Sequence, residues 1–200
     1  MPGKSSPEPW LVAGLGNPGP EYARTRHNMG AMVTSRLGER LGASFRKARF
    51  VPLFVAEAKH AGTPLLLTSP GTWMNVSGPG IASVAGRRHV PVERVIAVHD
   101  EIDLPFGALR VKRGGSTAGH HGLDSMVEAF RSPDFYRVRI GVGRPTRREH
   151  NVGHVLNAFS KHEREDVDVL IEDAADAVIS LIDQGLEETQ SRFNRGGVAT

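Results

Sequence analysis

Residues 10–42 read WLVAGLGNPGPEYARTRHNMGAMVTSRLGERLG, and this stretch decides the fold. It starts with a short apolar run, 10–14, that ends in glycine and is typical of a buried strand feeding a loop. The segment 28–42 has helical spacing of its apolar residues, which are Met29, Met32, Val33, Leu37 and Leu41. A strand, a loop and a helix in this order predict the first unit of an α/β sheet.

The rest of the chain continues to alternate strands with helices. We expect strands at 50–58, 65–68, 95–98, 109–113 and 135–142, and helices at 76–89 and 123–130. A last helix carries one apolar seam, formed by Val167, Leu170, Ile171, Ala174, Val178, Leu181 and Ile182. This alternation predicts a single α/β domain at 10–195, with a twisted, mostly parallel mixed sheet and helices on both faces.

Composition excludes several classes of protein. The 200 residues are 39% hydrophobic and 24% charged, which is ordinary for a globular domain. With no cysteine, the chain has no disulfide, zinc–thiolate site or thiol nucleophile. No apolar run approaches the roughly 18 residues of a membrane span. The lead at 1–9 lacks the apolar stretch of a signal peptide, so we expect it to be disordered and the protein to be cytoplasmic.

Charge is distributed unevenly along the chain, although its net value is only +3. Residues 105–148 contain nine Lys and Arg against three acids, whereas 163–188 contain one Arg against ten acids. This separation suggests one face that meets a polyanion and one that is kept away from it. Two solvated faces without a partner would give the same pattern.

The loop at 14–19, GLGNPG, formally matches the dinucleotide pattern G-x-G-x-x-G. A nucleotide site requires a helix that opens directly at the glycines and an acid about 20 residues on, at the end of a second strand. Here Pro18 and Pro20 stiffen the loop, and the position of the acid falls inside the expected helix. The sequence therefore argues against a nicotinamide or flavin cofactor, and we expect none.

Two other polar segments are candidates for catalysis, because ligands of such folds bind beyond the carboxyl ends of the strands. His27 follows the first loop, and the carboxylates of Asp100, Glu101 and Asp103 crowd the expected end of a strand. Imidazole is a natural general base near neutral pH, and it works best when a carboxylate orients it. A pair of His27 and Asp100 would suit hydrolysis by water. His27 could equally be a helix cap or a surface residue.

The third loop, 110–122, has cations, then glycines, then a helix start, which together can hold an anion such as a nucleic-acid phosphate. A glycine-rich structural turn is the alternative. The pair His120-His121 raises the possibility of a metal, with His27, His99 and Asp100 as further ligands. Adjacent residues rarely point at one ion and no H-E-x-x-H motif is present, so we expect no metal.

Taken together, the segments resemble bacterial peptidyl-tRNA hydrolases. The likeness is carried, in order, by GLGNPGPEYARTRHNMG at 14–30, TWMNVSG at 72–78, HDEIDLPFG at 99–107, KRGGSTAGHHGL at 112–123 and RVRIGVGRP at 137–145. The resemblance implies a monomeric hydrolase without cofactor that cleaves the ester between a peptide and the tRNA 3′ ribose, and that has no membrane association.

The resemblance also implies a role for individual residues. His27 would be the catalytic base and Asp100 the carboxylate that orients it. The substrate would contact Asn17, Asn75 and Met74, with Tyr22 supporting the pocket. Lys112 and Arg139 would hold the 5′-phosphate end of the tRNA, and residues 145–159 would form a mobile lid.

One departure from the family concerns His121. Where the family usually reads Gly-His-Asn-Gly, this chain reads GHHG at 119–122, so the third site amide is replaced by an imidazole. Imidazole keeps one donor and one acceptor, but it is bulkier and can take up a proton. We expect weaker substrate positioning with a stronger dependence on acid pH. A relative that binds tRNA or another RNA with weakened hydrolysis is the alternative function.

Overall fold

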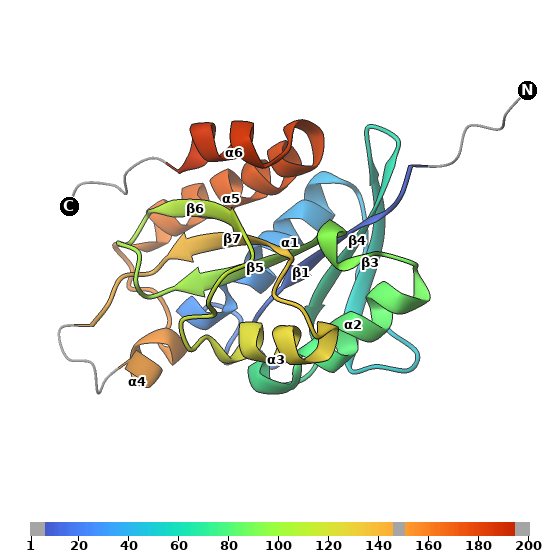
Figure 1. Ribbon diagram of the computed structural model, residues 1–200. Helices are drawn as coiled ribbons and strands as arrows, with labels where there is room; N and C mark the ends of the chain where they lie inside the picture. The colour runs from blue at the N-terminus through green and yellow to red at the C-terminus, as the bar shows by residue number, and fades with distance from the viewer. Residues whose placement is uncertain (1–6, 146–150, 195–200) are drawn as a thin grey trace, which may run out of the picture.

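Four parallel strands form the centre of the sheet in the computed structural model, which describes residues 7–145 and 151–194 (Figure 1). Within these residues the sheet has seven strands in the order β2-β3-β4-β1-β5-β7-β6. Neighbours among β4, β1, β5 and β7 pair in parallel, whereas β2, β3 and β6 pair antiparallel. The strands are β1 Trp10–Gly14, β2 Arg46–Lys47, β3 Leu53–His60, β4 Thr63–Pro70, β5 Val95–Glu101, β6 Leu109–Arg113 and β7 Tyr136–Gly141.

Helices cover both faces of this sheet, as the sequence predicts. One core cluster joins α1 and α5 to residues such as Val12 and Ile96, and a second joins α2 and α3 to Leu11 and Ala97. Because neighbouring strand residues point to opposite faces, these two clusters lie on opposite sides of the sheet. The helices are α1 Met29–Arg40, α2 Gly78–Arg87, α3 His121–Phe130, α4 Asn151–Leu156, α5 Arg164–Gln184 and α6 Leu186–Phe193, with short 3-10 turns η1 Arg26–Asn28, η2 Met74–Val76 and η3 Val92–Arg94. No described helix has both the length and the apolar character that crossing a membrane requires.

Several boundaries differ from those expected. Strand β3 begins at Leu53 instead of residue 50, and it turns into β4 through Ala61 and Gly62, whose φ values of 47° and 85° suit a two-residue hairpin. Strand β5 continues through Glu101, so His99 and Asp100 lie inside the strand and not after it. The sequence did not indicate β2, α4 or α6. Of the expected lead, residues 1–6 lie outside the described part, so its disorder stays a prediction.

The first turn of α1 approaches the ends of β1 and β5 very closely. A Cβ added to Gly30 would lie 2.0 Å from the carbonyl oxygen of Val98 and 2.5 Å from the backbone nitrogen of Leu15. Leu15 itself donates its N–H to the Val98 carbonyl at 3.0 Å. Only glycine allows this contact, and the contact brings the turn before α1, with His27, beside the end of β5.

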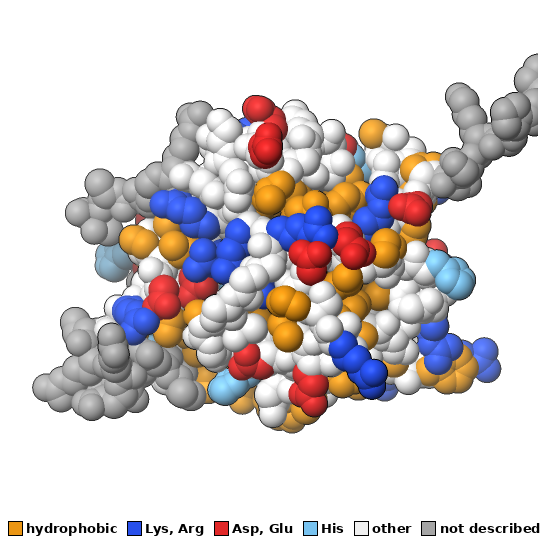
Figure 2. All heavy atoms as spheres, viewed as in Figure 1, with side chains coloured by type: hydrophobic (Ala, Val, Ile, Leu, Met, Phe, Trp, Pro, Cys, Tyr) orange, Lys and Arg blue, Asp and Glu red, His pale blue; other side chains and the backbone are white. Residues whose placement is uncertain are grey.

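The acids of α5 lie on one face of the sheet, and a group of cations lies over β6 and β7 on the other. The acids of α5 pair partly with α1, as in the Arg36–Glu172 and Arg40–Asp176 ion pairs of 2.5 and 2.7 Å. On the other face, Lys and Arg gather over β6 and β7 (Figure 2). This agrees with alternation along β6, where Val111 faces the α5 side and Lys112 the opposite one.

Candidate active site

A cleft of about 520 Å³ opens beyond the carboxyl ends of β1 and β5. Six of the nine predicted site residues line it: Asn17, His27, Met74, Asn75, Asp100 and His121. Its apolar wall includes Trp73, Ile102 and Leu156. Tyr22, Lys112 and Arg139 lie outside the lining. The sheet topology therefore assembles residues that are far apart in sequence, at the position where such folds bind ligands.

His27 and Asp100 form the pair that the sequence suggests. The Nδ1 atom of His27, in η1, lies 2.9 Å from Oδ1 of Asp100, in β5. Their side chains are 13% and 2% exposed. Because an ionised carboxylate only accepts hydrogen bonds, Nδ1 carries the hydrogen and Nε2 is left with a free lone pair. His27 is thus held in the tautomer that a general base requires.

A second imidazole contacts the same carboxylate oxygen. Nε2 of His120 lies 3.1 Å from Oδ1 of Asp100, while its Nδ1 accepts the N–H of Leu123 at 3.4 Å and so caps α3. Since Nδ1 accepts, Nε2 carries the hydrogen and donates it to Asp100. Sequence reasoning considered His120 only as a metal ligand. Its position directly before an apolar helical run was the available signal for a cap.

Electrostatics keep Asp100 ionised. Burial by itself would raise the pKa of this carboxyl, but the hydrogen bonds from His120 and His27 outweigh burial and hold the pKa well below its usual range. The neighbouring His99 is also buried and donates from Nδ1 to the Asp100 backbone carbonyl at 2.7 Å. Burial, and then the nearby His120, lower the pKa of His99 well below its ordinary value, so His99 is neutral.

Three groups of the cleft could in principle hold a metal ion. One ligand atom each from His27, Asp100 and His120 lies within 4.8 Å of the others. His99 and His121, which the metal alternative also includes, are not part of this cluster. Two imidazoles and a carboxylate suit zinc, but here both imidazoles aim N–H groups at one oxygen, which is hydrogen-bond geometry.

Asn17 is fixed by three hydrogen bonds of 2.9 Å. Its Oδ1 accepts the N–H of Met74, its own N–H donates to Oδ1 of Asn28, and Nδ2 of Asn28 donates to its carbonyl. No partner for its Nδ2 occurs among the described residues, so this amide N–H₂ group is available to the cleft. Asn28 is buried and was missed from sequence. Its role is to hold the loop that carries Asn17.

The apolar side of the cleft depends on Trp73. Tyr22 packs edge-on against Trp73, with ring centroids 5.7 Å apart and an interplanar angle of 82°. Tyr22 therefore supports this wall through its contact with Trp73. Next along the chain, Met74 is buried and Asn75 is exposed in η2. Residues 146–150 of the expected lid lie outside the described residues, whereas Leu156 of α4 lines the cleft.

His121 lies at the rim of the cleft as the first residue of α3. Its side chain is 75% exposed, and its Nδ1 is 3.9 Å from a carboxylate oxygen of Asp124. Neither observation fixes the orientation of the ring. The imidazole of His121 is therefore held less firmly than the amide of Asn17.

The predicted phosphate contacts are half-buried and lie on the face of β6 and β7 that points away from α5. Arg139 already pairs with Glu101, whose Oε2 accepts from Nη2 at 3.0 Å and from Nε at 3.2 Å. Lys112 has no such partner among the described residues. Partial burial, and then Arg139 and Arg137, lower its pKa. This accumulation of positive charge would be relieved by a bound anion.

Arg137 holds the glycine loop that precedes α3. It is fully buried and donates to the carbonyls of Ser116 and Gly115 at 2.7 and 2.8 Å. These two carbonyls are therefore turned inward, and the N-terminus of α3 is capped by His120. An anion-binding role for this loop stays a prediction, and Lys112 is the described residue that favours it most.

The fold and the cleft define an α/β enzyme with an oriented imidazole base at the carboxyl edge of its sheet. Comparison with known proteins gives the family: the model for "Peptidyl-tRNA hydrolase" matches residues 11–199. A peptidyl-tRNA hydrolase of Kineococcus radiotolerans is 45% identical over 191 residues, covering 92% of this chain and 96% of the relative. That of Frankia casuarinae is 47% identical over 186 residues, covering 93% and 94%.

A solved structure agrees with these relatives. The crystal structure of peptidyl-tRNA hydrolase from Acinetobacter baumannii superposes with a TM-score of 0.89 at 31% identity, covering 98% of this chain and all of the other. This chain belongs to the peptidyl-tRNA hydrolase family.

Proposed function

We propose that this protein hydrolyses the ester bond between a peptide and the 3′ ribose of tRNA, with His27 as the general base. The observation that carries this role is the Nδ1–Oδ1 bond of 2.9 Å to Asp100, which leaves Nε2 of His27 free at the cleft. The substrate is inferred from family membership, and the catalytic role of His27 is inferred from the geometry of the cleft.

Water is the nucleophile that the cleft residues support. The described lining contains no Ser, Thr, Cys or Lys side chain that could form a covalent intermediate. Nε2 of His27 takes a proton from water as the oxygen adds to the ester carbonyl carbon. The tetrahedral intermediate then expels the ribose oxygen, which receives the proton from the imidazolium. Asp100 stabilises the imidazolium between these two steps.

The amides position the acyl part of the substrate. Asn17 offers an N–H₂ group that is held rigidly by the backbone of Met74, and Asn75 offers a second amide at the rim. Met74, Trp73 and Leu156 provide apolar surface for peptide side chains. His120 is added to the site as the residue that positions Asp100.

Lys112 and Arg139 bind the phosphate end of the tRNA in this proposal. Lys112 lies in β6 and Arg139 in β7. Lys and Arg side chains gather over these two strands in Figure 2. We further propose that the enzyme acts as a monomer in the cytoplasm and needs no cofactor. A tRNA-binding relative with weakened hydrolysis is not favoured, because the cleft holds His27 against Asp100 and fixes the amide of Asn17 through the N–H of Met74.

The test is hydrolysis of N-acetyl-aminoacyl-tRNA by the purified protein. We expect cleavage of the blocked substrate, little cleavage of free aminoacyl-tRNA, and loss of cleavage in His27→Ala. Retained, salt-sensitive tRNA binding without cleavage would instead identify the weakened relative.

A further inference from the structure

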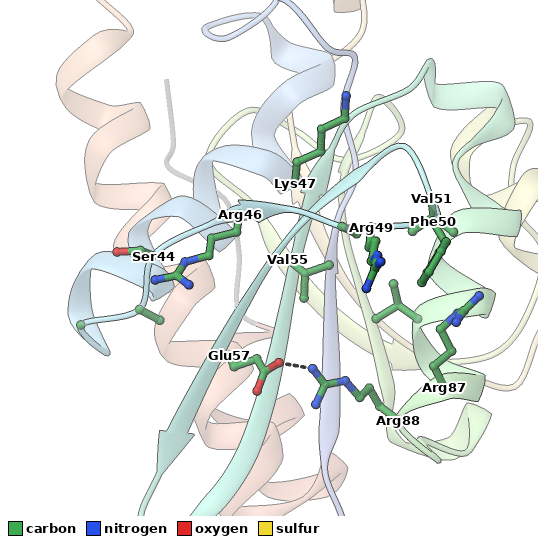
Figure 3. A pocket seen from close by; sticks show the side chains of 14 residues that line it. Ser44, Arg46, Lys47, Arg49, Phe50, Val51, Val55, Glu57, Arg87 and Arg88 are labelled. Atoms are coloured by element: carbon green, nitrogen blue, oxygen red, sulfur yellow. Dashed lines mark hydrogen bonds and ion pairs between the residues drawn. The ribbon is translucent and has the colours of Figure 1, made fainter.

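A second hollow, of about 650 Å³, lies at the other end of the same sheet, next to β2 and the C-terminal end of α2 (Figure 3). We name it the Phe50 pocket, after the aromatic at its mouth. The side chains that matter here are Arg46, Lys47, Arg49, Phe50, Arg87 and Arg88. None of them belongs to the cleft described above.

The Phe50 pocket is strongly basic. Five cations line it against one acid, Glu57, among the described residues. Glu57 is already paired with Arg88 (Figure 3). The other four cations have no carboxylate partner within the described part of the chain, so their charge is directed at solvent. Such an arrangement attracts a polyanion.

An exposed aromatic ring is placed among these cations. Phe50 is 67% exposed, and the guanidinium carbons of Arg49 and Arg87 lie 5.3 and 4.9 Å from its ring centroid. The three side chains lie side by side in Figure 3. The loop that carries Phe50 is closed by a 2.8 Å hydrogen bond from the N–H of Ala48 to the carbonyl of Leu53. The ring is therefore presented by a short, constrained loop.

A flat apolar ring beside planar cations is the recognition chemistry of unpaired nucleotides. Bases stack on aromatic rings and guanidinium planes, while Arg and Lys neutralise the phosphates. In a duplex the bases are stacked on one another, so none of them is available to stack on the ring of Phe50. We propose that the Phe50 pocket binds a segment of single-stranded RNA.

The position of the pocket separates this RNA from the tRNA that is being hydrolysed. The ten-residue helix α2, about 15 Å long, runs from beside η2 at the cleft to Arg87 at the pocket. Lys112 and Arg139 lie at the opposite end of the strand order, with the cleft between. The proposed phosphate contacts of the tRNA and the Phe50 pocket therefore lie on opposite sides of the cleft. This separation rests on the proposed function, whereas RNA binding at the pocket does not.

The test measures affinity of the full chain for fluorescent U10 by anisotropy over a range of salt concentrations. Phe50→Leu and Arg87→Gln are each expected to weaken U10 binding by at least about fivefold. Arg87→Gln should also lower the slope of log K against log salt by about 0.7. Arg192→Gln is the matched control, because Arg192 lies 4.9 Å from the ring of Phe193 in α6 but outside the pocket.

Parallel hydrolysis assays distinguish this proposal from the proposed function. We expect Phe50→Leu to leave KM and kcat for N-acetyl-aminoacyl-tRNA unchanged, and Lys112→Ala to leave U10 affinity unchanged. A ten-base-pair RNA duplex should bind with equal affinity to the wild type and Phe50→Leu. Unchanged U10 affinity in both pocket variants would overturn the proposal, and so would a rise in KM that parallels the loss of U10 binding. An inactive wild type would refute the hydrolase alone.

Discussion

Asp100 and His120 are joined by a hydrogen bond of 3.1 Å between Oδ1 and Nε2, and this bond uses the same oxygen that holds His27. One carboxylate therefore connects the proposed base to the start of α3. His120 has its other nitrogen committed to capping that helix, so its orientation is set by the backbone of Leu123. The carboxylate is held from both sides before any substrate arrives, which is the preorganisation that an oriented base needs.

Replacing Asp100 by Asn should impair turnover much more than binding. The amide removes the charge that stabilises the imidazolium and can favour the wrong tautomer of His27. We expect kcat to fall by about 10²–10⁴-fold, with KM changed little. Steady-state kinetics with N-acetyl-aminoacyl-tRNA measure both constants. A kcat within twofold of the wild type would remove Asp100 from the mechanism.

Two substitutions of His120 separate its two hydrogen bonds. His120→Gln keeps a donor for Asp100 and weakens the cap, so kcat should be nearly retained while unfolding stability falls by about 1 kcal/mol. His120→Asn keeps a capping oxygen and loses the donor to Asp100, so kcat should fall by about tenfold with stability retained.

Kinetics and urea unfolding of both His120 variants give the two readouts. If the two variants lost kcat equally and in proportion to their stability, His120 would be a structural residue only.

Glu101 should limit tRNA affinity by neutralising Arg139. Glu101→Gln leaves Arg139 free for phosphate, so we expect a lower KM and a steeper salt dependence. Lys112→Ala should raise KM and reduce the slope of log K against log salt by about 1. Binding of deacylated tRNA across salt concentrations is the measurement. Relative to the wild type, the slope should become steeper in Glu101→Gln and shallower in Lys112→Ala. A change in the same direction in both variants would contradict the assignment of Lys112 and Arg139 as phosphate contacts.

Stability should fall in mild acid because of His99. Its folded pKa lies well below its unfolded value, so the unfolded chain takes up a proton first as the pH falls. Below a pH of about 6.5 the folded state should lose about 1.4 kcal/mol per pH unit from this residue.

His99→Asn keeps a donor for the Asp100 carbonyl and does not titrate. Urea unfolding at pH 7.5 and 5.5 should therefore show a smaller loss in this variant than in the wild type. An equal loss of unfolding free energy in the wild type and His99→Asn would show that other groups cause the acid sensitivity.

His121→Asn should improve substrate binding without changing stability. The exposed imidazole at the rim is held loosely. The smaller amide is the group that the family resemblance implies at that position. We expect a lower KM and an unfolding free energy within about 0.5 kcal/mol of the wild type. An equal KM and an equal pH profile in the wild type and His121→Asn would show that the histidine at position 121 does not weaken substrate binding.

The periodicity of apolar residues in the sequence was sufficient to predict the main strands and helices of the α/β architecture. The strand at 10–14, the helix of α1 and the seam of α5 are long or strongly patterned, so local preference and burial agree. It was not sufficient for β2, a two-residue edge strand, or for α6, because their short segments depend on neighbours from distant parts of the chain.

The residue types of the site were evident from sequence, since a histidine and a carboxylate after apolar strands suggest an oriented base. Family resemblance supplied Asn17 and Asn75. The tertiary structure alone decided that His120 shares the carboxylate of Asp100, that Asn28 fixes the loop of Asn17, and that Arg139 is paired. Each of these contacts joins residues at least eleven positions apart. Such contacts depend on how strands are ordered and how closely helices approach, which no local sequence pattern specifies.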